Sequence, residues 1–425
     1  MYRIELTGPD GEKREWTAEI AGTLVEREKA CHALARDVER AVLEASLRSG
    51  QPACARPICC GRPMKKSRLR SRKLLTPVGV VEWSRRVFVC PLCGRHAVPL
   101  DALLAVPTCQ VSPRLAAIGL DLVAVQPYDK ARAQLERLYG VHVATGTLEN
   151  LASRVRPAAW AFEEMALAQG VPAGPVERLY VGCDGVMVCS NQLGSDGKLQ
   201  WREVKVGCCF WTNPDGTFHK RILGRFESAP VFGDGLRRGA DRYGLAAARE
   251  VVFLGDGAEW IWNLAARHFN EPKVTWVLDG YHVTEHLWEA ARALHPEEKG
   301  QQESLVNTWK DVLRSEGGRR LWQTLRTQLQ GALEADDRAA LTKLIGYIQP
   351  RMDQMDYPAY RARKMYIGSG AVESAVKQLV GMRAKGPGMH WKAPDGIQAV
   401  LSLRAIQLNG EWGCFWDQDP LRRAA

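Results

Sequence analysis

The sequence predicts an α/β protein whose central sheet carries acidic residues and whose chain is interrupted by a long helical segment. Five segments between residues 179 and 278 are rich in β-branched and aromatic residues and are separated by turn signals or amphipathic stretches. Asp184, Asp256 and Asp279 lie within or directly after three of them. Residues 283–364 are charged, rich in Leu and Gln, and almost free of strand signals, which favours an all-helical insertion.

Length and charge restrict the class of protein. A chain of 425 residues is too long for one core and predicts two to four domains. The net charge of +10 favours a polyanionic partner. No segment approaches the roughly 18 to 20 apolar residues that span a bilayer, so we expect a cytoplasmic, nucleoid-associated protein without membrane contact. Its twelve cysteines are then expected to be free thiols or metal ligands.

Residues 1–50 predict a short strand, Tyr2 to Leu6, and a long amphipathic helix from about Thr23 to Ser46. Residues 51–105 follow as a zinc-ribbon-like module. Cys90 and Cys93, followed by Gly94, form a knuckle that presents two thiolates to one Zn²⁺. The upstream knuckle is irregular, because Pro57 stands three residues before Cys60, and Cys59 or Cys54 replaces the missing ligand. The alternative is a vestigial ribbon held by packing.

A dense run of basic residues separates the two knuckles. We interpret it as a cationic loop that contacts phosphates, although a solvated basic face has the same composition. The residues singled out are Lys65, Lys66, Arg68, Arg70, Arg72 and Lys73.

Residues 106–170 predict a helical domain with a helix-turn-helix. Pro113 to Val125 and Tyr128 to Tyr139 read as two helices, and a third begins at Thr145 or Thr147 and runs to about Val155. A polar face on the third helix, including Arg154 and Arg156, could read DNA. Any three-helix bundle would give a similar pattern. A linker, Val171 to Pro175, ends this domain.

Residues 171–282 form the first part of the predicted core. The order is three strands in hairpins, a helix, a strand, a helix and a strand, which is typical of the ribonuclease H-like fold. In that fold the first strand is central and the fourth lies beside it in parallel. Asp184, inside the first strand, and Asp256, after the fourth, would therefore converge. Two neighbouring carboxylates repel each other unless cations bridge them, which favours a site for two Mg²⁺ or Mn²⁺ ions.

Alternatives exist for the individual acids. Asp184 could instead cap a turn with Gly185, and Asp279 could cap the following helix beside a packed His282. Either Asp256 or Asp279 could be the second acid; the adjacency of strands one and four favours Asp256.

Residues 365–409 return the chain to the core, and residues 410–425 form a tail. Glu373 lies in the first turns of a helix that follows Gly368-Ser369-Gly370, with Lys377 one turn further along. Such a pair is often only a surface ion pair, but here the helix could deliver a third carboxylate to the sheet edge. Lys385 and Lys392 follow in a basic and aromatic segment expected to contact DNA.

Between residues 50 and 410 the chain resembles the DDE transposases of bacterial insertion sequences, of the ISKra type and distantly similar to Mutator-like transposases. The resemblance rests on Asp184-Gly185, Gly255-Asp256-Gly257-Ala258-Glu259-Trp260, Asp279-Gly280-Tyr281-His282 and Gly368-Ser369-Gly370-Ala371-Val372-Glu373-Ser374. It implies that Asp184, Asp256 and Glu373 bind the catalytic metals, while Asp279 and His282, with Lys377, lie in a second layer or contact DNA.

The function expected from this resemblance is metal-dependent cleavage and strand transfer at the terminal inverted repeats of a transposon. The partners would be double-stranded DNA, as transposon ends and target, and a second copy of the chain in a homodimer. Two alternatives are a non-catalytic DNA-binding regulator derived from a transposase and a structure-specific nuclease of the same fold.

Overall fold

The computed structural model describes residues 1–8, 11–49, 56–168, 176–332 and 334–423. Two compact units make up the chain, one of residues 1–159 with 413–425 and one of residues 160–412. The predicted linker Val171 to Pro175 and the alternative ligand Cys54 lie outside the described residues. No helix in the described parts of the chain is long and apolar enough to cross a membrane.

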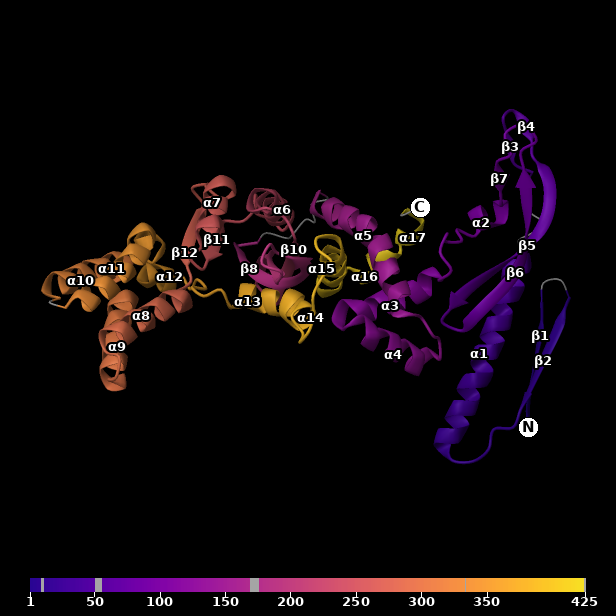
Figure 1. Cartoon of the computed structure of the whole chain (residues 1–425), viewed down its shortest axis with the longest axis horizontal. Coiled ribbons are helices and arrows are strands. Elements are labelled where there is room, and N and C mark those ends of the chain that lie inside the picture. Colours follow the sequence, from indigo (N-terminus) through magenta and orange to yellow (C-terminus); the bar gives the residue numbers. More distant parts are fainter. Residues whose placement is uncertain (9–10, 50–55, 169–175, 333, 424–425) are drawn as a thin grey trace. The chain divides into compact units, whose positions relative to one another are not determined.

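The first unit begins with a β-hairpin and a long helix (Figure 1). Strand β1 (Tyr2–Thr7) pairs antiparallel with β2 (Lys13–Ala18), a strand that the sequence analysis missed, and α1 (Leu24–Ser49) follows. Helix α1 packs through Leu43 and Leu47 against a small core that contains Val81 and Trp83.

A three-stranded antiparallel sheet follows the helix. Strand β5 (Lys65–Thr76) pairs with β6 (Gly79–Val89), which pairs with β7 (His96–Ala97); β3 (Ile58–Cys59) and β4 (Arg62–Pro63) form a separate hairpin, and α2 (Pro99–Leu103) succeeds β7. The predicted cationic loop is therefore wrong: the basic run is strand β5. Alternation explains the error, because the buried Leu74 and Thr76 appear only at the end of a strand whose earlier residues are mostly exposed.

Three helices follow, and the last of them continues from the first unit into the second. α3 (Pro113–Val125) and α4 (Tyr128–Tyr139) have the predicted bounds, and α5 (Thr145–Ala168) continues thirteen residues beyond the predicted end at Val155. Helix α4 ends at Gly140, whose φ of 59° is left-handed. Short helices α16 (Trp412–Trp416) and α17 (Pro420–Arg423) end the described chain.

The second unit is built on a mixed five-stranded sheet in the order β10-β9-β8-β11-β12, and the predicted α/β class is confirmed. Strands β8 (Arg178–Leu193), β9 (Leu199–Thr212) and β10 (Phe218–Arg225) are antiparallel, and β11 (Glu250–Gly255) and β12 (Val274–Leu278) run parallel to β8. The first strand is central and the fourth adjoins it, as the element order predicted.

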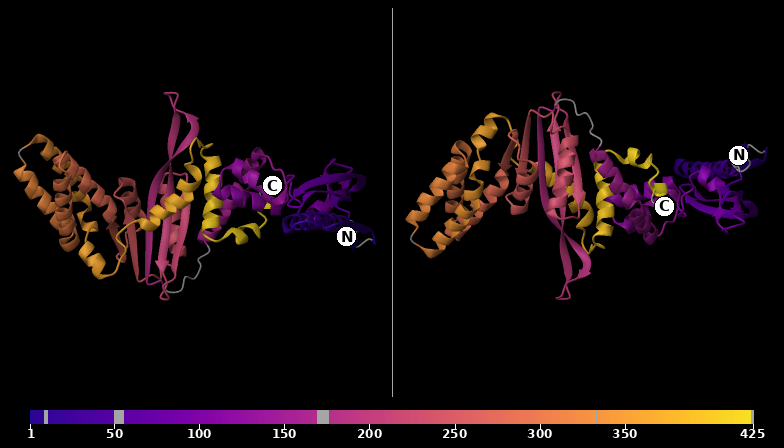
Figure 2. Two further views of the ribbon diagram at one scale, coloured as in Figure 1. Left: turned by 90° about the horizontal axis from the view of Figure 1, so that it is seen from below. Right: turned by 90° about the horizontal axis from the view of Figure 1, so that it is seen from above.

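Helices cover both faces of the sheet (Figures 1 and 2). Helices α6 (Ala229–Arg242) and α7 (Glu259–His268) bury Phe232, Leu236 and Ile261 against one face, together with Val181 and Cys183 of β8. The opposite face carries α13 (Gly370–Val376), the π-helical turn η2 (Lys377–Gly381), α14 (Met382–Ala384) and α15 (Asp395–Leu408).

Between β12 and α13 the described chain is helical. It comprises α8 (Gly280–Leu294), α9 (Lys299–Glu316), α10 (Gly318–Gly331), α11 (Ala335–Ile348), the 3₁₀ turn η1 (Gln349–Gln354) and α12 (Tyr357–Ala362). Helix α8 begins directly after Asp279, at Gly280, three residues earlier than the predicted helical segment of residues 283–364.

Candidate functional site

Three aspartates form a row across neighbouring parallel strands, with Asp184 inside β8 and Asp256 and Asp279 directly after β11 and β12. The pairing of β8 with β11 includes Gly182 opposite Leu254, and the same register continued by two residues places Asp184 beside Asp256. The pairing of β11 with β12 ends with Gly255 opposite Leu278, and one further step places Asp256 beside Asp279. The backbone N–H of Asp279 donates to the carbonyl of Gly255 over 2.8 Å, which keeps this register to its last residue.

The charge of Asp184 is poorly compensated by protein groups. Burial, followed by the negative charge of Asp256, raises the pKa of Asp184 to about 6. The backbone N–H of Gly185 donates to Asp184 Oδ1 over 2.6 Å, and this bond and the nearby His282 act in the opposite direction. A cation bound between Asp184 and Asp256 would compensate the negative charge of these two carboxylates.

The turn that carries Asp256 is held by the helical segment. Ala258 N–H donates to Asp256 Oδ1 over 2.9 Å, and the Tyr347 hydroxyl donates to the Asp256 carbonyl over 3.3 Å. Arg351 donates from two nitrogens to the carbonyl of Gly257, at 2.7 and 3.1 Å. Tyr347 and Arg351 were not predicted from the sequence, because nothing in a Leu- and Gln-rich helical segment indicates a contact with a strand end about ninety residues away.

Asp279 is buried and is surrounded by hydrogen-bond donors. Its Oδ1 accepts from Tyr281 N–H at 2.6 Å and caps α8, and its Oδ2 accepts from Ser369 N–H at 2.8 Å and from the Ser369 hydroxyl. The capping role foreseen as an alternative is therefore present. Asp279 also ties β12 to the loop that precedes α13.

Glu373 lies beside Asp279 through the same serine. The Ser369 hydroxyl is 2.9 Å from Glu373 Oε1 and also contacts Asp279, yet it carries only one proton to share between two carboxylates. Ligand atoms of Asp279, His282 and Glu373 all lie within 4.8 Å of one another. The structure thus brings Glu373 to Asp279 and His282, and it brings Asp184 to Asp256 and His282.

Because glycine has no Cβ, Gly182 leaves room for α13 to approach β8. Because Val181 and Cys183 face α6 and α7, Gly182 and Asp184 point to the face that carries α13. A Cβ at Gly182 would lie 2.6 Å from Val372 Cγ2 and 3.1 Å from the Leu254 carbonyl. Val372 precedes Glu373, so this contact places Glu373 on the same face as Asp184.

Two lysines of the strands beside β8 were not predicted from the sequence. Lys220 of β10 donates to Ser374 Oγ over 3.2 Å and to Gln378 Oε1 over 2.9 Å, which ties the sheet to α13 and η2. Lys205 of β9 lies on the opposite face, over the Trp260 ring, and pairs with Glu203 over 2.7 Å. Glu203 contributes to the raised pKa of Asp184. Lys377 is exposed at the start of η2, and Lys385 and Lys392 are also exposed.

Four cysteine thiols of the first unit form a second candidate centre. Cys59, Cys60, Cys90 and Cys93 lie close enough to hold one metal ion. The sulfur of Cys59 is 3.7 Å from that of Cys93 and 3.9 Å from that of Cys60. A tetrahedral zinc site with Zn–S bonds of about 2.3 Å has edges of about 3.8 Å. The donor set and its spacing therefore fit Zn²⁺.

The backbone shapes both knuckles. Gly94 N–H donates to the Cys90 carbonyl over 3.0 Å, and Gly94 has a left-handed φ of 70°. The irregular knuckle places Cys60 at a φ of 51°, which lets two adjacent cysteines turn towards one point. Backbone N–H groups of Cys93 and Leu92 lower the pKa of Cys90 to about 7, which favours the thiolate that a metal requires.

The basic residues predicted to contact DNA divide into two groups. Arg72 donates to the carbonyls of Pro107 and Cys109, and Arg154 contacts the Thr108 hydroxyl, so both hold loops in place. Lys73 forms an exposed ion pair with Glu82, and Arg156 is half-buried with partners of its own. The remaining basic side chains of β5 that were singled out are exposed or half-exposed on one ribbon and free to meet phosphates: Lys65, Lys66, Arg68 and Arg70.

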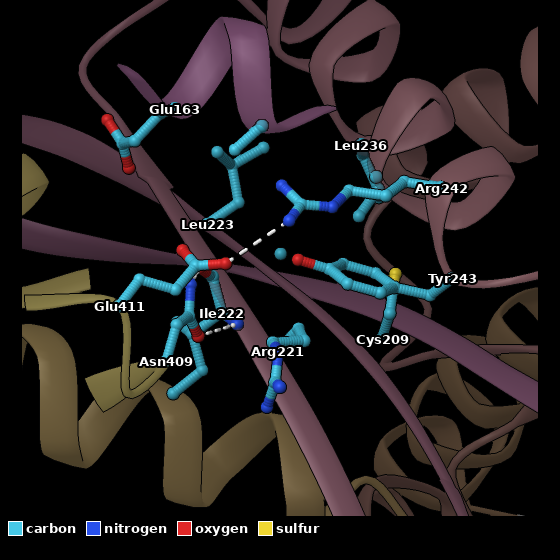
Figure 3. Close-up of a pocket in the computed structure, with 13 residues that line it drawn as sticks. Glu163, Cys209, Arg221, Ile222, Leu223, Leu236, Arg242, Tyr243, Asn409 and Glu411 are labelled. Carbon is cyan, nitrogen blue, oxygen red and sulfur yellow. Dashed lines mark hydrogen bonds and ion pairs between the residues drawn. The ribbon is translucent and has the colours of Figure 1, made fainter. Parts of the chain in front are cut away.

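A cavity between α6 and strands β9 and β10 is too small to be the site (Figure 3). Its volume is about 30 Å³, room for one or two water molecules. Arg242 and Glu411 form an ion pair there at 3.4 Å, and burial raises the pKa of Tyr243 to about 12. Arg242, Glu411 and Tyr243 therefore stabilise the fold and do not belong to the candidate site.

No family model matches the sequence. No curated protein matches it either. Among solved structures, the chain is similar to the Drosophila P element transposase strand transfer complex, with 10% identity, a TM-score of 0.38, and coverage of 73% of this chain and 95% of that one. It is also similar to the Mos1 mariner paired end complex with Mn, with 10% identity, a TM-score of 0.15, and coverage of 59% and 81%.

Proposed function

We propose that this protein is a DNA transposase with a ribonuclease H-like core, of the insertion-sequence type that resembles the ISKra group and, distantly, the Mutator-like transposases. The observation that carries the proposal is the row of Asp184, Asp256 and Asp279 across three parallel strands, with Glu373 delivered to the same face by α13. The strand order, with a central antiparallel hairpin and two parallel strands on one side, supports this core.

The oxygen-rich end of the sheet suits hard divalent cations. Asp184, Asp256 and Glu373 would hold two Mg²⁺ or Mn²⁺ ions, with Asp279 and His282 beside Glu373. Carboxylate oxygens are ligands that suit Mg²⁺ and Mn²⁺. Bound ions would supply the positive charge that activates a water or 3′-hydroxyl nucleophile and stabilises the leaving oxygen.

The remaining residues position this site. Asp279 and Ser369 hold the loop before α13, which sets where Glu373 lies. Tyr347 and Arg351 fix the turn that carries Asp256. His282 can donate to a phosphate oxygen of the scissile strand. The exposed basic residues of β5 and the polar face of α5 would bind the DNA ends. A Zn²⁺ ion held by the four cysteines would stabilise the module that contains β5.

The test uses the purified full-length protein and a plasmid carrying the DNA that flanks its gene. Asp184→Asn should abolish Mn²⁺-dependent strand cleavage, a loss of roughly a thousandfold or more, and leave DNA binding intact. Asp196→Asn, in the exposed turn between β8 and β9, is the matched control and should retain activity. Cleavage retained by Asp184→Asn would refute the assignment.

A labelled 3′-hydroxyl end separates transposition from the other two functions. A transposase joins this end to target DNA, a structure-specific nuclease cuts without joining, and a regulator binds without doing either. Joined product that depends on both Asp184 and Glu373 is the expected result.

A further inference from the structure

Asp184, Asp256, Asp279 and Glu373 are called the acidic cluster below. A pocket opens beside this cluster, on the side of the helical segment. Its volume is about 270 Å³, and it lies between α8, α9 and α12. Gly280 and Tyr281, which directly follow Asp279, form its wall on the side of the acidic cluster. The floor includes Tyr357, whose hydroxyl donates to the Leu278 carbonyl over 2.8 Å. The pocket is thus built onto the strand end that carries Asp279.

Three cations line the pocket and no acid balances them there. Lys310 and Arg314 stand one turn apart on α9, so both point to the same side of that helix, and Arg361 comes from α12. The described residues that line the pocket include no carboxylate. Like charges held this close repel each other, and an anion between them would remove that cost.

An exposed aromatic ring stands at the border between the pocket and the acidic cluster. Tyr281 is 72% exposed, which is unusual for a large aromatic side chain. Its ring packs along the backbone of Gly368, where a Cβ would lie 3.1 Å from the ring. Its neighbours in sequence, Asp279 at the N-cap and His282, belong to the cluster around Glu373. An open ring beside a cationic pocket is the arrangement that binds a base and its phosphate.

We propose that this pocket binds one nucleotide of a DNA strand next to the bond that is cut, and this inference rests on the proposed function. The base stacks on the Tyr281 ring. The phosphate of the same nucleotide contacts Lys310, Arg314 and Arg361. Stacking tolerates any base, so the pocket would hold the strand without reading its sequence. Through this contact the helical segment positions the strand at the acidic cluster.

The first experiment uses the full-length wild-type protein and a single-stranded oligonucleotide of twelve nucleotides that contains 5-iododeoxyuridine. Mixtures in EDTA are irradiated, digested and analysed by mass spectrometry. A crosslink on Tyr281 is expected, since this chromophore reacts preferentially with a stacked aromatic ring. Crosslinks confined to other residues would overturn the proposal.

The second experiment measures affinity for a fluorescein-labelled oligothymidylate by anisotropy, again in EDTA. Tyr281→Leu should weaken binding by about fivefold or more. Lys310→Ala with Arg314→Ala should reduce the slope of log affinity against log salt by about 1.4, the loss of two phosphate contacts. The charge-matched control, Arg338→Ala with Lys343→Ala on α11, should leave the slope nearly unchanged. An equal loss in both pairs would show only non-specific attraction and would contradict the pocket.

The two proposals fail in different ways. Crosslinking at Tyr281 without metal-dependent cleavage would leave the pocket and remove the transposase. Cleavage that requires Asp184, together with no crosslink at Tyr281 and no effect of the pocket variants, would leave the transposase and remove the pocket.

Discussion

The cysteine cluster and the acidic cluster are both groups of metal-binding side chains, but they are assembled in opposite ways. Cys59 and Cys93 are separated by 34 residues and come from two tight turns of one small module. Asp184 and Glu373 are separated by 189 residues, and the helical segment lies between them in the chain. The first centre is encoded by local backbone geometry, whereas the second exists only after a sheet and a returning helix have packed.

In both clusters, neighbouring groups raise the pKa of at least one metal-binding side chain. Among the thiols, backbone N–H groups lower the pKa of Cys90, whereas contacts with neighbouring thiols raise the pKa of Cys59 and raise that of Cys60 to about 12. At the sheet, burial and the negative charge of Asp256 raise the pKa of Asp184, while the Gly185 N–H and the nearby His282 oppose this shift. In both clusters a bound cation would stabilise the charged side chains.

The largest effect should follow from removing metal from the cysteine cluster. Structural zinc contributes on the order of 10 kcal/mol to small modules of this kind. A chelator, or Cys93→Ser, should therefore abolish hydrogen-exchange protection in β3 to β7 while β8 to β12 remain protected. The exposed Cys31→Ser on α1 is the control and should retain one zinc per chain. Purified protein without zinc, yet with the module protected, would contradict the local assembly of this centre.

Asp184→Asn should stabilise the metal-free protein at neutral pH. The pKa of Asp184 is raised in the folded protein, so folding favours its protonated form. This group's favourable contribution is present below the unfolded pKa and is lost as pH rises through about 6. Relative to wild type, the variant should gain up to about 3 kcal/mol at pH 7.5 and almost nothing at pH 4.

Urea denaturation in EDTA between pH 4 and 8 measures this difference. A gain that is independent of pH would show that the charge of Asp184 is not its source. Added Mn²⁺ should stabilise wild type more than the variant, because binding to the folded state alone raises stability.

Gly182→Ala tests the contact that delivers Glu373. The new Cβ would approach Val372 and the Leu254 carbonyl, and such overpacking costs about 1–3 kcal/mol. Because α13 must shift to make room, cleavage should fall by more than the loss of stability explains. Gly346→Ala, in α11 with nothing near its Cβ, should be neutral or slightly stabilising. Full cleavage activity in Gly182→Ala would separate the position of α13 from catalysis.

The smallest effect is expected at Ser369. Ser369→Ala removes the hydroxyl that contacts Asp279 and Glu373, while its backbone N–H still donates to Asp279. Stability should fall by about 1 kcal/mol. The dissociation constant for Mn²⁺, measured by titration calorimetry, should rise several-fold, because Glu373 loses a contact that positions it. Ser374→Ala, whose hydroxyl contacts Lys220 instead, is the matched control.

Much of the fold was predictable because its signals are local. The helices at Pro113 to Val125 and Tyr128 to Tyr139 have the predicted bounds, since apolar periodicity, Pro and Gly mark them. The β5 strand was not predicted, because its cationic side chains hide the alternation that normally reveals a strand. Strand β2 was missed for a similar reason, as half of its residues are exposed in a two-stranded hairpin.

The sequence by itself determined which residues are available for chemistry: the four cysteines in two knuckles, the aspartates at strand ends and a Glu after Gly-Ser-Gly. Only the tertiary structure decided which of them meet. It set Asp279 and His282 beside Glu373 through Ser369, and it brought Tyr347 and Arg351 to the turn of Asp256. The physical reason is that knuckles, caps and strand ends depend on neighbouring residues, whereas the meeting of β8 with α13 depends on the absence of one side chain at Gly182.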